Sequence, residues 1–191
     1  MTSTTHTGPN PPRLAWAAVG RCVVTSLVML GHRQVRLAQG NLGRTIRFAD
    51  GSSAQVYRET VVPGRTPSEP CFLAVSFRLR RVRGRGHALF RLESILNTPL
   101  FVGFPGFVSK LWLANDAHGV YRGVYEWDGA TRAEAYARAL WRVLALVSVP
   151  GSIHYRVVTG VRRSDLLANP ELLGREGPAG PTDWWRLVDV A

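Results

Sequence analysis

The order of segments between residues 106 and 160 constrains the fold of this chain most. Two β-favouring runs, 106–113 and 119–127, flank a short polar turn. An amphipathic helix follows them, and residues 152–158 supply a further strand. With a strand at 71–80 and a short helix at 87–97 upstream, the order becomes β-α-β-β-α-β. This order is typical of a ferredoxin-like α+β sandwich, in which two helices cover an antiparallel sheet.

The helix after the second run is predicted over residues 131–147. Thr131 and Glu134 have the spacing of a capping box, and apolar residues recur behind them every three or four positions. In the strand at 71–80, one face carries apolar residues and the other carries both apolar and polar residues. We therefore expect this strand to be half-buried. The domain predicted from all these elements covers residues 69–160.

The flanking segments are predicted as additions to this domain. Residues 1–13 are rich in threonine and proline and are expected to be disordered. Residues 14–68 are expected to form an N-terminal helix and a β-hairpin that turns at Asp50 and Gly51. Residues 161–191 form a C-terminal tail, in which the adjacent Trp184 and Trp185 are expected to dock on the body or on a neighbouring subunit.

Composition limits the partners and the compartment. The 191 residues carry a net charge of +11, almost entirely from arginine, since Lys110 is the single lysine. An excess of positive charge suits a polyanion, but no aromatic residue interleaves the arginine-rich run 78–85, which disfavours nucleic acid. Cys22 and Cys71 lack the spacing of a metal site or a disulfide framework, so we expect no metal and a reducing, cytoplasmic location.

The apolar segment 14–30 leaves two placements open. It is shorter than the roughly 20 residues that span a bilayer. It would form a helix packed on the domain, or it would lie at a membrane surface, because arginines that suit anionic lipid are placed in and around it. These arginines are Arg13, Arg21, Arg33 and Arg36. Membrane association through this helix is therefore an alternative to a purely cytoplasmic location.

Residues 106–110 and 119–127 resemble the dimeric α/β-barrel superfamily, and most nearly its small monooxygenases related to antibiotic-biosynthesis monooxygenases. In that family a strand ending in Tyr-x-Trp leads into a helix whose alanines and aromatic residue close over the sheet. The same order is present here in Tyr125, Trp127, Ala135, Tyr136 and Ala137. The resemblance covers residues 69–160. It implies a ferredoxin-like fold, a homodimer paired sheet to sheet, and a pocket between each sheet and its helices.

The resemblance also implies cofactor-independent oxidation of an electron-rich small molecule. Its haem-degrading branch uses a strand asparagine and a helix histidine, which this chain lacks at the matching positions, so no cofactor is expected. The predicted function is a cofactor-free, monooxygenase-like enzyme acting on a planar, possibly anionic compound. The alternatives are a non-catalytic ligand-binding or interaction protein on the same fold, and a basic protein that binds a membrane surface or another polyanion.

The candidate catalytic residues are three side chains able to hold or transfer a proton. Tyr136 lies on the apolar stripe of the predicted helix, where it would otherwise be a core aromatic residue. His87 follows an arginine-rich loop at a helix start, where it would otherwise be an exposed loop residue. His154 alternates with apolar residues on the last strand and is expected to face the interior.

The candidate substrate-binding residues are strand aromatics and arginines. The aromatic residues would form flat walls for a planar substrate, or they would only fill the core. The arginines precede the start of a predicted helix, where an anionic ligand is favoured. The alternative is that they form a solvated loop. The set consists of Trp127, Trp112, Tyr125, Phe77, Arg78 and Arg85.

Overall fold

The computed structural model describes residues 3–4, 11–80, 82, 86, 94–173 and 181–191. The strands are β1 (Ser3–Thr4), β2 (Arg36–Ala38), β3 (Thr45–Phe48), β4 (Ser53–Val61), β5 (Pro70–Arg78), β6 (Phe107–Leu113), β7 (Val120–Asp128), β8 (His154–Thr159) and β9 (Leu187–Val190). The α-helices are α1 (Pro12–Gly31), α3 (Ala130–Val147) and α4 (Arg163–Ala168), and the 3-10 helices are η1 (Ser94–Leu100), η2 (Pro170–Leu173) and η3 (Pro181–Asp183).

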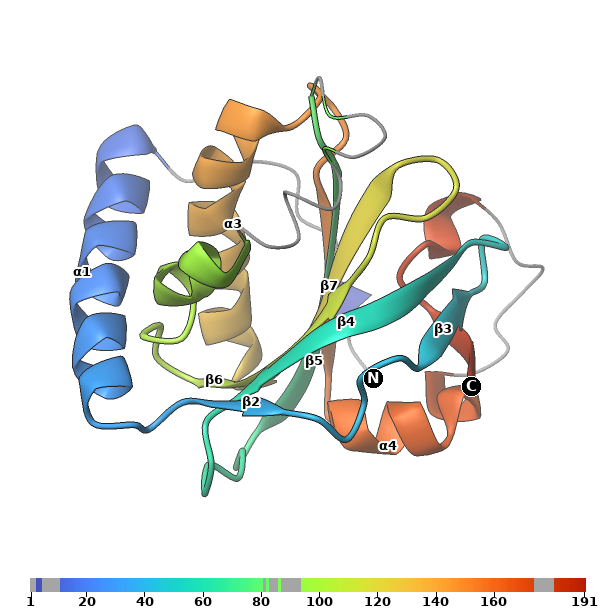
Figure 1. Ribbon diagram of the computed structural model, residues 1–191, viewed down its shortest axis with the longest axis horizontal. Coiled ribbons are helices and arrows are strands. Elements are labelled where there is room, and N and C mark those ends of the chain that lie inside the picture. The colour runs from blue at the N-terminus through green and yellow to red at the C-terminus, as the bar shows by residue number, and fades with distance from the viewer. Residues whose placement is uncertain (1–2, 5–10, 81, 83–85, 87–93, 174–180) are drawn as a thin grey trace.

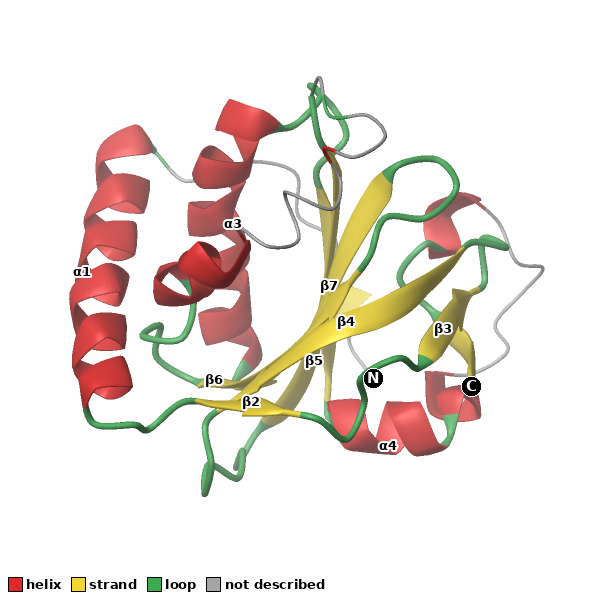
Figure 2. Cartoon of the chain, in the orientation of Figure 1, coloured by secondary structure: helices red, strands yellow, loops and turns green. Residues whose placement is uncertain are grey.

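The described residues form an α+β fold around one antiparallel sheet. Its strand order is β1-β8-β5-β7-β6-β4-β3-β9, and β2 pairs with β4. Figure 1 shows α1 and α3 on one side of the sheet and α4 with β3 on the other, and Figure 2 shows the strands between these layers. The four strands predicted for residues 69–160 are adjacent in the order β8-β5-β7-β6.

The N-terminal segment extends this sheet. The predicted hairpin forms between β3 and β4, and Gly51 takes the positive φ of 83° that favours glycine in its turn. Strand β4 then pairs with β6 along most of its length. The boundary predicted at residue 69 therefore does not interrupt the sheet, which runs from the predicted domain into the segment before it.

The first core lies between the sheet, α3 and α1. The apolar stripe predicted for α3 is buried at Ala133, Tyr136, Ala139 and Leu140. The predicted capping box does not form, because α3 begins one residue earlier, after Gly129, and has no side-chain cap. Of the helix predicted at 87–97, residues 87–93 lie outside the described part, and the described remainder belongs to the 3-10 helix η1.

The opposite face of the sheet is buried by the chain's own C-terminal segment. Phe72 and Val124 of the sheet pack there with Leu166 of α4 and Leu187 of β9, and all four are almost fully buried. Strand β5 is consequently buried on both faces, and the prediction of a half-buried strand is wrong. A homodimer paired through this face, as the resemblance implies, would have to displace that layer. Trp184 and Trp185 are partly buried against the same core.

Helix α1 forms the outermost layer, packed on α3 and η1. It is the one helix in the described part of the chain that is long and apolar enough to cross a membrane by length and composition. The same length and composition occur in core helices, but only 28% of its apolar window is buried. Several of its apolar side chains are instead exposed, among them Leu14, Trp16, Val24, Leu27 and Val28.

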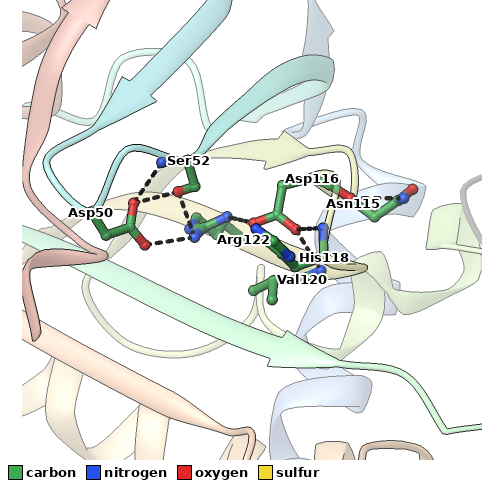
Figure 3. A network of polar contacts seen from close by, with 7 residues as sticks. All are labelled: Asp50, Ser52, Asn115, Asp116, His118, Val120 and Arg122. Carbon is green, nitrogen blue, oxygen red and sulfur yellow. Dashed lines mark hydrogen bonds and ion pairs between the residues drawn. The ribbon is translucent and has the colours of Figure 1, made fainter. Parts of the chain in front are cut away.

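A buried ion network ties the β3–β4 hairpin to the turn between β6 and β7 (Figure 3). The Arg122 guanidinium lies 2.7 Å from a carboxylate oxygen of Asp116 and 3.2 Å from one of Asp50. The other Asp116 oxygen accepts hydrogen bonds from the backbone N–H groups of His118 and Val120. Only 3% of the Asp116 side chain and 4% of the Arg122 side chain are exposed. This network positions the turn that leads into β7.

Candidate functional site

A cavity of about 750 Å³ lies between the sheet and α3. Strands β5, β6 and β7 supply one wall, α3 supplies another, and residues in and after η1 close a third side. Its volume is in the range of ligand sites, roughly 300–1,000 Å³. No acidic residue is among the described residues that line it. Its aromatic lining consists of Tyr57, Phe77, Phe101, Trp112, Tyr121, Tyr125 and Tyr136.

Lys110 of β6 places an amine inside this aromatic lining. Its Nζ lies 3.1 Å from the centroid of the Trp112 ring, 4.5 Å from that of Phe101 and 4.8 Å from that of Tyr125. Only 6% of the residue is exposed. Within the described part of the chain, no hydrogen bond or ion pair of the Lys110 side chain is found. A buried lysine normally has such a partner, so the amine stands out from an ordinary core position.

The surroundings of Lys110 favour its neutral form. Burial lowers its pKa well below the usual 10.5, and the positive charge of Arg58 lowers this pKa further. The Arg58 guanidinium carbon lies 5.2 Å from the centroid of the same Trp112 ring. Each aromatic ring attracts an ammonium by about 2 kcal/mol when desolvated, and this attraction opposes the burial that lowers the pKa. The amine is therefore both accessible to the cavity and shifted toward its nucleophilic state.

Two phenols line the cavity beside this amine. The Tyr136 hydroxyl donates a hydrogen bond to the Tyr125 hydroxyl at 3.1 Å. Burial raises the pKa of Tyr125 and of Tyr136, so both remain protonated at neutral pH. Neither phenol is suited to act as a base while its pKa is raised in this way. Both are suited to orient a polar ligand group through hydrogen bonds.

Arg80 brings a second positive charge to the cavity lining. Its guanidinium donates hydrogen bonds to the carbonyl oxygens of Ala145 and Ser148, which lie at the C-terminal end of α3. Cations are favoured at this end of a helix, because the last carbonyl groups have no partner within it. These bonds hold Arg80, which is itself exposed, at the solvent side of the cavity.

Four of the predicted site residues lie together. Phe77, Trp112, Tyr125 and Tyr136 all line the cavity. Trp127 does not line it. Trp127 is fully buried, and its ring centroid lies 4.8 Å from that of Tyr136, so the core interpretation applies to it.

The remaining predicted site residues are elsewhere or undescribed. His154 is exposed, with its ring centroid 6.1 Å from that of Trp184 in the layer on the other face of the sheet. The expectation that His154 faces the interior is therefore wrong, and it shares no site with Tyr136. Arg78 is exposed and does not line the cavity. Arg85 and His87 lie outside the described residues.

Sequence reasoning missed Lys110 as a site residue. The available signal was a lone lysine two positions before Trp112 on a predicted strand, because residues i and i+2 share one face. For metals, the described residues contain no group of three or more His, Cys, Asp or Glu side chains that could hold an ion.

Comparisons with known proteins assign no family to this chain. No protein-family model matches it, and no curated protein matches it. Among solved structures, the fold is similar to that of a major regulator of staphylococcal pathogenesis, with 12% sequence identity and a TM-score of 0.41. The match covers 84% of this chain and 98% of the regulator. A likeness of this level supports no inference about function.

Proposed function

We propose that this protein binds a planar, anionic small molecule in the cavity between the sheet and α3 and acts on it there. The observation that carries the proposal is Lys110, a buried amine with no counter-ion in the described part of the chain. The aromatic walls suit a flat ligand, because rings stack on one another or meet edge to face. Arg80 gives the cavity lining a positive charge, and an acidic ligand beside Lys110 would raise the pKa of that amine and favour its protonated form.

A matched pair of ligands tests the proposal. Naphthalene-2-carboxylate and 2-naphthalenemethanol share one ring system and differ in charge, so their affinities measured by calorimetry isolate the contribution of the acid. We expect the carboxylate to bind more tightly to the wild-type chain. We expect Lys110→Met to lose this preference while still binding the alcohol. Equal affinities in the wild type, or binding of neither compound, would contradict the proposal.

The chemistry that we propose for the bound ligand is cofactor-free, monooxygenase-like oxidation. The strand order β8-β5-β7-β6 supports a ferredoxin-like topology for residues 69–160, which is the fold of the monooxygenases that this segment resembles. In the cavity, the Tyr125 and Tyr136 hydroxyls would orient a phenolic or enolic group of the substrate. Native mass spectrometry of protein from its own source would identify a retained compound and report whether the protein is a dimer. Absence of oxygen uptake with that compound would rule out the oxidation.

A second candidate function is attachment to an anionic membrane surface through α1. The exposed apolar side chains of Val24, Leu27 and Val28 favour it, since each is more than half exposed on the outermost helix. No acidic residue occurs in the first 49 residues, whereas Arg13 and Arg21 are exposed on the same helix. Apolar side chains flanked by arginines suit the boundary between lipid head groups and acyl chains.

Co-sedimentation with vesicles tests this attachment. We expect the chain to pellet with vesicles that contain phosphatidylglycerol and to remain in solution with neutral vesicles. Joint replacement of Val24, Leu27 and Val28 by serine is expected to abolish pelleting. The matched control is Leu146→Ser on α3, which changes a side chain that is 65% exposed outside α1. Equal pelleting of the triple variant and the control would exclude α1 as the membrane contact.

A further inference from the structure

The position of Lys110 is unusual for a residue with only a structural role. Buried lysines are rare, and a structural one is expected to donate to a carboxylate or to backbone carbonyl groups. The described residues supply Lys110 with three aromatic ring faces instead. The same amine borders an open cavity. A side chain placed in this way is available to a molecule that enters the cavity.

Two physical conditions turn a lysine into a nucleophile, and Lys110 meets both. One is desolvation in a hydrophobic pocket, and the other is a neighbouring cationic group. Trp112, Phe101 and Tyr125 supply the first condition, and Arg58 supplies the second. Arg58 of β4 lies near the amine, and the other charged or titratable side chains among the described residues that line the cavity include no carboxylate. They are Tyr57, Arg80, Tyr121, Arg122, Tyr125 and Tyr136.

We propose that Lys110 forms a covalent imine with an aldehyde or ketone that also carries an acidic group. The inference rests on the proposed function, because the carbonyl compound must first occupy the cavity. The carbonyl class follows from the amine, and the acidic group follows from the basic lining of the cavity. Imine formation requires no metal and no redox partner.

The bond changes of this step balance. The lone pair of Nζ attacks the carbonyl carbon and forms an N–C bond, while the carbonyl π electrons move to oxygen. A proton passes from nitrogen to that oxygen and gives a carbinolamine. A further proton converts the hydroxyl to water, which leaves with the C–O bond pair as the nitrogen lone pair completes the C=N bond. The product is a protonated imine and one molecule of water.

The neighbouring side chains have distinct parts in this step. The Tyr125 ring lies 4.8 Å from Nζ, and its hydroxyl accepts a hydrogen bond from Tyr136. A phenol so placed is suited to donate to the carbonyl oxygen as negative charge develops there. The protonated imine carries a positive charge, which burial and Arg58 disfavour, and the acidic group of the ligand compensates this charge.

Reductive trapping tests the inference, and the single lysine makes the result unambiguous. The full-length chain is incubated with 6-formylnaphthalene-2-carboxylate, and borohydride then reduces any imine to a stable secondary amine. Intact mass reports the number of adducts. Cleavage after arginine releases residues 92–122 with Lys110, separate from the α-amino group of Met1. Binding of naphthalene-2-carboxylate, which has no carbonyl to trap, is measured in parallel.

We expect one adduct, on Lys110. We also expect Lys110→Arg, whose guanidinium cannot form this imine, to show no adduct in residues 92–122. An adduct only at Met1, with naphthalene-2-carboxylate still bound by the wild type, would overturn the imine and leave the proposed function standing. Failure of the wild type to bind either compound would overturn both.

Discussion

Lys110 and Trp112 share one face of β6, and the lysine Nζ lies 3.1 Å from the centre of the indole ring. Phe107 also packs into the core on this face, although three positions separate it from Lys110. The pairing of β6 with β7 shifts register between Phe107 and Ser109, and this irregularity accounts for the spacing. The irregularity therefore brings Phe107 to the face that Lys110 and Trp112 share by regular alternation.

Replacing Lys110 by methionine is expected to increase the free energy of unfolding at neutral pH. The folded chain holds this amine with a pKa below 10.5, so at pH values between that folded-state pKa and 10.5 the unfolded chain binds more protons than the folded chain. The free energy of unfolding of the wild type should accordingly rise with pH up to about 10.5, the usual lysine pKa. The greater stability of Lys110→Met relative to the wild type should shrink over the same range. Urea denaturation at neutral and alkaline pH measures the difference. A difference that does not change with pH would refute this expectation.

The two tryptophans predicted as substrate walls should behave differently. Trp127→Ala is expected to cost about 3–5 kcal/mol of stability, because it leaves a void in the first core. Trp127→Phe should lose less stability and leave the affinity for naphthalene-2-carboxylate unchanged. Trp112→Phe should weaken that affinity, since Trp112 lines the cavity. Urea denaturation and calorimetry on the same three proteins separate the effects, and a weakened ligand affinity in Trp127→Phe would contradict the assignment.

Asp116 should protect the fold against acid. Burial raises its pKa, but hydrogen bonds from Arg122 and from the backbone N–H groups of Val120 and His118 outweigh burial and lower it below 3.8. Because this pKa is depressed, the stability it contributes is present above 3.8 and is lost as pH falls through the folded value. Asp116→Asn should cost about 3 kcal/mol at neutral pH by leaving Arg122 under-compensated. Thermal denaturation from neutral to acid pH should show the two proteins converging.

Leu187 of β9 tests whether the tail is an integral layer of the fold. Leu187→Ala is expected to cost about 2–5 kcal/mol, because this side chain is buried against the second face of the sheet. The adjacent Val188 is 48% exposed, so Val188→Ala should change stability by less than about 0.5 kcal/mol. Urea denaturation measures both. Equal small effects would mean that the tail contributes little to the fold in solution.

The sequence predicted those elements whose pattern is local. The Asp50–Gly51 turn and the apolar stripe of α3 are encoded within short windows, and both are present. The covering of the second sheet face was not predicted, because it depends on β9 pairing with β3, which lies about 140 residues earlier in the chain. His154 was misplaced for the same reason, since the layer beside it comes from the distant tail.

From the sequence, part of the candidate site could be predicted, namely the large aromatic side chains on the predicted strands. Phe77, Trp112 and Tyr125 were identified as possible cavity walls because each is a large aromatic residue on a predicted strand. Lys110 was counted only as a charge. Its face could be read from its spacing of two residues from Trp112, but the nearby Arg58 comes from β4 and cannot be read from residue types along one strand.

The central claim is that Lys110 is an amine of lowered pKa in a ligand cavity, and one NMR titration tests it directly. Lysine labelled with ¹³C at the ε position gives a single side-chain signal in this protein, because the chain has one lysine. The account predicts a titration midpoint well below 10.5 in the free protein, moving upward when naphthalene-2-carboxylate binds. A midpoint at or above 10.5 in the free protein would contradict it, because the amine would then be an ordinary ammonium stabilised by its aromatic neighbours.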